Sequence, residues 1–169
     1  MNYMKNMEEI RKTRYIDVPF QYDSIIKSKA TSATIYRGAI LLTPGKFADK
    51  ITNDFVLYKA EILRKYAKNW ISNYLNLDHS RFPLHRIGYV ENPRFQDNAL
   101  KGDLYIFPLT TTAKDTIALI DNGLVNKLSI EMRTDDYYDY REGCIIADDI
   151  EFIGCAVVTN PADPHTRIK

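Results

Sequence analysis

One histidine and one serine form the pair of residues best suited to covalent chemistry in this sequence. His79 lies in the segment NLDHS (residues 76–80), and Ser129 follows 50 residues later in KLSIEM (residues 127–132). A serine hydroxyl is a weak nucleophile near neutral pH unless a base removes its proton, and histidine is the usual base. If the two side chains meet in space, they could attack a carbonyl carbon and transfer an acyl group.

Neither residue is diagnostic by itself. A histidine in an apolar run is often a core residue with satisfied hydrogen bonds, and serines are common on strands. A nearby carboxylate would strengthen the pair, because it can orient the imidazole. Asp148, Asp149 and Glu151 lie in an otherwise apolar region, where a charge is costly to bury unless it is paired. Either one of these acids has such a partner or the three mark an exposed edge.

Other catalytic chemistries lack a matching motif. The chain has three histidines but no HExxH segment and no CxxC pair, so we expect no metal site. No G-x-S-x-G elbow surrounds Ser129, and the seven glycines are scattered rather than gathered in a phosphate-binding loop. We therefore expect neither a metal nor a cofactor.

The composition is that of an ordinary globular domain. A chain of 169 residues can bury a core without disulfides, and a net charge of +1 favours neither nucleic acid nor a membrane as a partner. Cys144 and Cys155 are isolated from each other, which predicts buried free thiols in a reducing compartment. No apolar run approaches the ~20 residues of a membrane helix, and the first residues do not resemble a signal peptide. These features predict a cytoplasmic protein.

The order of the elements predicts an α+β fold. Polar residues 1–14 are interpreted as a flexible arm, and residues 15–169 as a single domain. Apolar spacing predicts one amphipathic helix over 55–75 and a second over 113–121, and DDYYDYREG (135–143) suits a hairpin or a surface loop. Extended patterns predict strands at 15–20, 33–42, 74–79, 87–90, 100–109, 125–132, 144–147 and 150–159. Together they indicate a mostly antiparallel sheet or barrel with two main flanking helices.

Five segments, taken in order, resemble the prohead (capsid maturation) proteases of tailed bacteriophages, which share a fold with herpesvirus assemblin. They are similar to that family's early strand and turn, its catalytic-histidine motif, a glycine-containing strand, its nucleophile strand and its closing motif. The segments are RGAILLTPG (37–45), LNLDHS (75–80), RIGYV (86–90), LSI (128–130) and VVTNPADP (157–164). The resemblance covers residues 36–164 and implies a serine protease with a herpesvirus-protease-like fold.

The resemblance also implies roles for individual residues. His79 matches the general base and Ser129 the nucleophile. Asp149 is the best match for the third member of a catalytic triad, with Asp148 and Glu151 as rivals. Donors for the oxyanion are left open between backbone amides of a nearby loop and the side chain of Arg133.

The segment after the serine departs from the family pattern. Glu131 and Met132 stand where a glycine and an aromatic residue are common in the family. Because strand residues two apart share a face, Glu131 is expected on the same face as Ser129. It either shapes specificity at the substrate cleft or signals weakened activity.

The biology of the family implies the surroundings in which the chain works. The expected substrates are capsid and scaffold proteins, followed by self-cleavage, in the host cytoplasm inside the assembling prohead. The resemblance further implies a homo-oligomer. The alternatives are a protease-like assembly protein with little or no activity, and an unrelated binding module whose segments match by chance.

Overall fold

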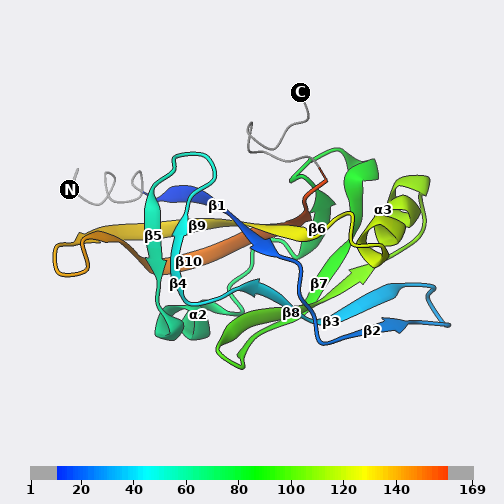
Figure 1. Ribbon diagram of the computed structural model, residues 1–169, viewed down its shortest axis with the longest axis horizontal. Coiled ribbons are helices and arrows are strands. Elements are labelled where there is room, and N and C mark those ends of the chain that lie inside the picture. Colours follow the sequence, from blue (N-terminus) through cyan, green and yellow to red (C-terminus); the bar gives the residue numbers. More distant parts are fainter. Residues whose placement is uncertain (1–10, 160–169) are drawn as a thin grey trace.

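The computed structural model describes residues 11–159, which form a single large sheet with two α-helices and one short 3₁₀ helix (Figure 1). Residues 1–10 of the predicted arm (1–14) and residues 160–164 of the closing motif (157–164) lie outside the described residues. The strands are β1 (Lys12–Pro19), β2 (Ser24–Lys27), β3 (Thr34–Leu42), β4 (Gly45–Ala48), β5 (Phe55–Tyr58), β6 (Tyr74–Leu77), β7 (Arg86–Gln96), β8 (Ala99–Ile106), β9 (Lys127–Asp139) and β10 (Cys144–Val157). The helices are α2 (Ala60–Tyr66), η1 (Pro83–His85) and α3 (Thr111–Asp121).

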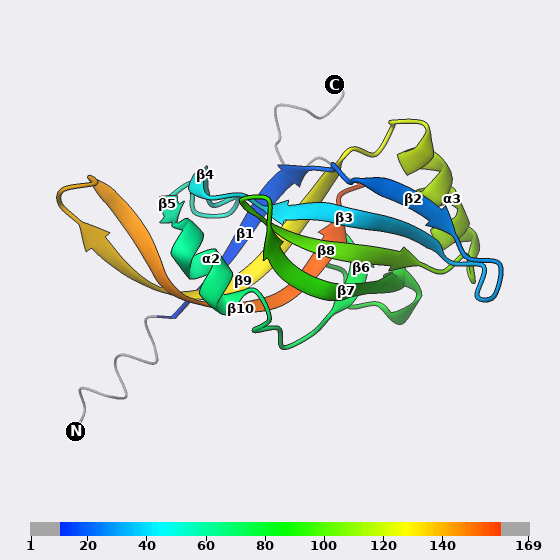
Figure 2. The same cartoon turned by 90° about the horizontal axis from the view of Figure 1, so that it is seen from below.

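The sheet is mixed and open. Its strands follow the order β1-β9-β10-β6-β7-β8-β3-β2, and β4 and β5 form a branch that joins at β10. Most neighbours are antiparallel, but β5 and β6 both pair with β10 in parallel. Among the described residues β1 and β2 end the path without pairing to each other, so the barrel form of the prediction is only partly supported. Figure 2 shows β9 and β10 as a long pair that extends beyond the rest of the sheet.

The core lies against one face of the central strands. In β9, Leu128, Ile130 and Met132 are fully buried and belong to the main hydrophobic cluster. Successive strand residues point to opposite faces, so Ser129 and Glu131 must lie on the other face of the same strand. The apolar residues therefore fix the orientation of the polar ones.

Two of the predicted boundaries near the first helix were wrong. The helix expected over 55–75 is only α2, because the aromatic and β-branched residues of β5 pair with β4 and β10 instead. Beyond α2, Trp70 forms a bridge with Phe152 and stacks on its ring at a centroid distance of 4.8 Å. The second predicted helix is confirmed as α3, which begins after Thr110, whose hydroxyl accepts a hydrogen bond from the amide of Ala113.

Two predictions from composition can be compared with the described residues. Cys144 and Cys155 are both free and buried, as predicted, and burial raises the pKa of Cys155 to about 12. Neither α-helix within residues 11–159 is long and apolar enough to cross a membrane.

The predicted arm was too long, because β1 begins at Lys12 and its third residue is fully buried. The guanidinium of Arg14 donates to the carboxylates of Asp49, Asp54 and Asp136 at 2.8–3.1 Å. Asp49 is also fully buried. These hydrogen bonds and ion pairs offset the cost of placing a charge inside the protein and attach β1 to the loop before β5 and to β9.

Replacing Arg14 with methionine should destabilise the fold by about 3–5 kcal/mol, since the carboxylate of Asp49 would be left buried without its cation. Urea denaturation would measure the change in the free energy of unfolding. Lys27→Met is the matched control, because Lys27 forms an exposed ion pair with Asp121 that should contribute less than ~1 kcal/mol. Equal effects of the two changes would contradict the structural role of Arg14.

Candidate active site

Ser129 and Glu131 lie side by side on the face of β9 that points away from the core. Strand β9 runs between β1 and β10, where Ser129 is paired with Asp17 on one side and with Ala156 on the other. A strand held on both sides has little freedom to slip, because a shift of one residue would move its apolar side chains to the wrong face. The sheet thus fixes the position of the serine.

His79 reaches the serine from a strand two places away in the sheet. It follows β6, whose Leu77 pairs with Val157 of β10, and Val157 in turn pairs with Leu128 of β9. Both Asp78 and His79 adopt left-handed backbone conformations, with φ of 48° and 56°. This tight turn ends β6 and directs the imidazole back across β10.

Small residues on β10 leave room for the imidazole. Ala156 stands between Asn76 of β6 and Ser129 of β9, and Gly154 is opposite Glu131. Paired residues project from the same face of a sheet, so larger side chains at these two positions would project into the gap between His79 and β9. Gly154 and Ala156 therefore serve the site as well as the strand.

The imidazole of His79 contacts the hydroxyl of Ser129 directly. The distance from Nε2 of His79 to Oγ of Ser129 is 2.8 Å, within hydrogen-bond range. The hydroxyl donates to Nε2 when the imidazole proton is on Nδ1, which is the arrangement required of a general base. Ser129 has no exposed surface in this conformation. The side chains that cover Ser129 would have to move before a substrate could reach its hydroxyl.

Glu131 is the carboxylate beside the histidine. Its Oε1 lies 3.7 Å from Nδ1 of His79, too far for a strong hydrogen bond but close enough for an ion pair with a protonated imidazole. Tyr15 of β1 donates its phenolic hydrogen bond to Oε2 of Glu131 at 3.1 Å, and its ring packs edge-on against the imidazole. Tyr15 therefore contacts both members of the pair and limits their movement.

Burial and charge act in opposite directions on the histidine. Burial is the larger effect and lowers the pKa of His79, because it disfavours the charged imidazolium, whereas the carboxylate of Glu131 raises it. Lys50 also lowers this pKa, and Asp17 and Asp78 raise it. The net result is a pKa below the ordinary value of 6.5, so the imidazole is neutral and able to accept a proton near neutral pH.

The prediction that Asp149 orients the histidine does not fit the structure. Asp149 accepts a hydrogen bond from Arg11 at 3.3 Å and is opposite Asp135 on β9. Along β10 it lies roughly 20 Å from the partner of Ser129, at ~3.3 Å per strand residue. The same guanidinium also pairs with the rival Glu151, at 3.7 Å. These acids lie on a distant part of the β9–β10 pair, because the hairpin continues well beyond the site.

Asp148, the other rival for the third triad position, and Arg133, a candidate oxyanion donor, also lie away from the site. Asp148 is exposed on the same distant part of β10, and Arg133 pairs with Glu151 at 3.5 Å rather than with the site. Within residues 11–159, no three His, Cys, Asp or Glu side chains gather as metal ligands would.

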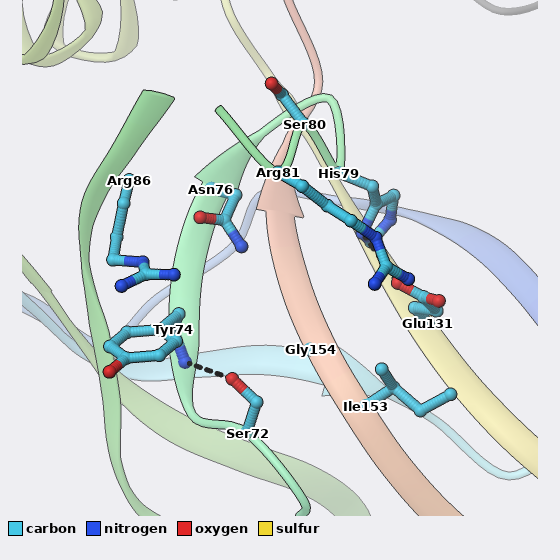
Figure 3. A pocket seen from close by; sticks show the side chains of 10 residues that line it. All are labelled: Ser72, Tyr74, Asn76, His79, Ser80, Arg81, Arg86, Glu131, Ile153 and Gly154. Atoms are coloured by element: carbon cyan, nitrogen blue, oxygen red, sulfur yellow. Dashed lines mark hydrogen bonds and ion pairs between the residues drawn. The ribbon is translucent and has the colours of Figure 1, made fainter. Parts of the chain in front are cut away.

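A cavity of about 320 Å³ opens beside the pair (Figure 3). His79 and Glu131 form one side of it, and Arg81 projects over that side. On the opposite side the guanidinium of Arg86 stacks over the ring of Tyr74 at 3.6 Å. The cavity thus joins the candidate base to a polar and positively charged lining, with room for an extended segment of a ligand.

Glu131 and Tyr15 contact His79 but were not predicted as members of a catalytic triad. Glu131 was identifiable as a charge on the serine's face of the strand, although its proximity to the imidazole was not. No sequence pattern indicated that Tyr15 belongs to the site, because its position opposite Glu131 depends on the pairing of β1 with β9. Pairing between strands 116 residues apart cannot be read from local patterns.

The fold is similar to that of a phage capsid assembly protease. The solved structure of the bacteriophage T4 capsid assembly protease, gp21, superposes on this chain with a TM-score of 0.62 over 89% of this chain and 99% of that one, at 16% sequence identity. A scan of protein-family profiles and a search of curated proteins both give no match. At this level of identity the likeness describes the arrangement of the backbone.

Replacing Glu131 with glutamine should lower the pKa of His79 further, because the imidazolium would lose the carboxylate that stabilises it. NMR titration of the ring protons would measure this, with the His79 signals assigned from a His79→Ala spectrum. Asp149→Asn is the matched control and should leave the titration unchanged. An unchanged or raised pKa in the Glu131 variant would contradict the electrostatic contact.

Proposed function

We propose that the chain is a serine endopeptidase of the prohead maturation type. The observation that carries the proposal is the 2.8 Å contact between Nε2 of His79 and Oγ of Ser129. This contact occurs in a fold shared with a capsid assembly protease. A binding module with chance sequence matches would have no reason to bring these two side chains together.

The reaction begins with attack of Ser129 on a peptide carbonyl. His79 accepts the hydroxyl proton at Nε2 as the bond to the carbonyl carbon forms, and the carbonyl oxygen takes up negative charge. The imidazolium then donates that proton to the nitrogen of the departing peptide, leaving an acyl-enzyme. In the second half, His79 removes a proton from water as the water oxygen attacks the acyl carbon. The imidazolium then returns that proton to Oγ of Ser129 as the acyl bond breaks, which releases the carboxylic acid product and restores the free enzyme.

Glu131 takes the part that the family resemblance implied for Asp149. Its carboxylate lies next to Nδ1, so it favours the tautomer with a proton on that nitrogen and stabilises the imidazolium that forms during attack. Tyr15 holds the other carboxylate oxygen. The position two residues past the nucleophile, where Glu131 departs from the family pattern, therefore contributes to catalysis in this proposal.

The second candidate is a protease-like assembly protein without activity. The complete burial of Ser129 favours it, since a hydroxyl without access cannot attack. We favour a closed form of an active enzyme because the base, the hydroxyl and the carboxylate are all present and in contact. A scaffold protein would need none of these contacts.

The substrates and setting follow from the same proposal. Capsid and scaffold proteins would be cleaved inside the assembling prohead in the host cytoplasm, and the chain would act there as a homo-oligomer. The protein gp21, which is similar in fold, is a capsid assembly protease.

Replacing Ser129 with alanine should lower peptide cleavage by about 10³-fold or more without unfolding the domain, because the nucleophile is lost and little else changes. Mass spectrometry of a digested peptide library would measure cleavage, and a fluorophosphonate probe would label the reactive hydroxyl. Ser28→Ala is the control, since Ser28 lies in the loop after β2 and its hydroxyl accepts a hydrogen bond from the nearby amide of Thr31.

The same assay separates the two candidates. An active enzyme should lose probe labelling in both Ser129→Ala and His79→Ala and retain it in Ser28→Ala. Absence of labelling and cleavage in the wild-type chain, alone and mixed with capsid and scaffold proteins, would favour the inactive assembly protein.

A further inference from the structure

The turn that carries His79 needs support from outside itself. Asp78 and His79 both have positive φ, a conformation that side-chain-bearing residues adopt at some cost. Two such residues in succession hold this shape only where neighbouring groups fix them. The contacts of the turn therefore determine where the imidazole points.

One support is local. The amide of Ser80 donates to the carbonyl of Leu77 at 2.8 Å, and the Ser80 hydroxyl lies 2.7 Å from Nδ1 of His85. These bonds close the loop on itself. They do not connect it to the strand that carries the serine.

The other support joins the turn to the end of β10. The amide of Asp78 donates to the carbonyl of Val157 at 3.0 Å. Its carboxylate accepts a hydrogen bond from the amide of Thr159 at 2.8 Å and a second from the Thr159 hydroxyl. Asp78 and Thr159 are 81 residues apart in the sequence. Three hydrogen bonds thus attach the residue before His79 to one short segment.

The same segment, the end of β10, also pairs with the start of β9 and so sets the position of Ser129. Val157 pairs with Leu128, and the amide of Val158 donates to the carbonyl of Lys127. The end of β10 therefore holds the histidine turn on one side and the start of β9, next to Ser129, on the other. A shift of this segment would change the distance between base and nucleophile.

We propose that Asp78 is a positioning residue, whose contact with Thr159 fixes the His79 turn to the end of β10 and so sets the reach of the imidazole to Ser129. The catalytic meaning of this contact rests on the proposed serine protease function. The contact itself can be tested without activity. Both residues are exposed, so water competes for these hydrogen bonds and modest changes should weaken them.

Thr159→Val tests the contact with little change in shape, because it removes the hydroxyl and keeps the backbone amide. We expect kcat to fall roughly tenfold with KM nearly unchanged, since a small misplacement of a catalytic group slows the chemical step. Thr159→Ser restores the hydroxyl and should restore the rate. Thr31→Val is the matched control, because the Thr31 hydroxyl accepts from the amide of Ala33 in the distant loop before β3.

A second readout follows the imidazole directly. Burial lowers the pKa of His79, so a looser turn should let water reach the ring and raise this pKa toward 6.5 in Thr159→Val. NMR titration measures this in a protein with or without activity. Thr159→Ser and Thr31→Val should both titrate like the wild-type protein.

Asp78→Asn provides an independent variant if the threonine change impairs folding, because asparagine tolerates the left-handed conformation but is a weaker acceptor. It should slow cleavage, and combining it with Thr159→Val should add little to the loss, as expected for two residues that share one contact.

The outcomes separate this proposal from the proposed function. If the wild-type chain cleaves peptides but Thr159→Val matches Thr31→Val in both kcat and the pKa of His79, the positioning role is wrong and the protease stands. If the wild-type chain is inactive but the pKa rises only in Thr159→Val, the contact stands and the protease assignment is wrong.

Discussion

Strand β10 hydrogen-bonds to β9 on one side and to β6 on the other, and the geometry of the site follows from this double pairing. The serine is on one neighbour and the histidine follows the other, so the distance between them is set by the width of the strand between. Two adjacent strand spacings amount to about 10 Å. The turn after β6 and the His79 side chain together span this distance, and they can do so because β10 carries the small residues Gly154 and Ala156 here.

Among residues 11–159, the buried charges of Arg14, Asp49 and Lys101 all lie beside charges of opposite sign. Arg14 is buried beneath the sheet among three carboxylates, and the next residue, Tyr15, points to the other face and bonds Glu131. One short strand thus connects a buried ionic cluster to the candidate active site. Coulomb interactions are stronger where water is excluded, so the single carboxylate near His79 can influence its protonation although the two do not form a short hydrogen bond.

The sequence predicted the parts of the site that depend on local patterns. An apolar alternation around Ser129 indicated a strand, and the family resemblance paired that serine with His79. The same patterns could not identify the third member, because Asp149 and Glu131 are both plausible acids until the register of β9 against β10 and β1 is known. Residue 55 onward was predicted as helix for a similar reason: the aromatic spacing of β5 suits a helix face, and only its pairing with β10 makes it a strand.

The parallel pairing of β6 with β10 affects when the site can form during synthesis of the chain. Val157 and Leu77 are neighbours in the sheet but are 80 residues apart in the chain, and contacts of such long range form slowly during folding. A ribosome makes the histidine first, the serine second and the strand that unites them last. The growing chain therefore carries His79 and Ser129 for some time before β10 is made and can bring them together.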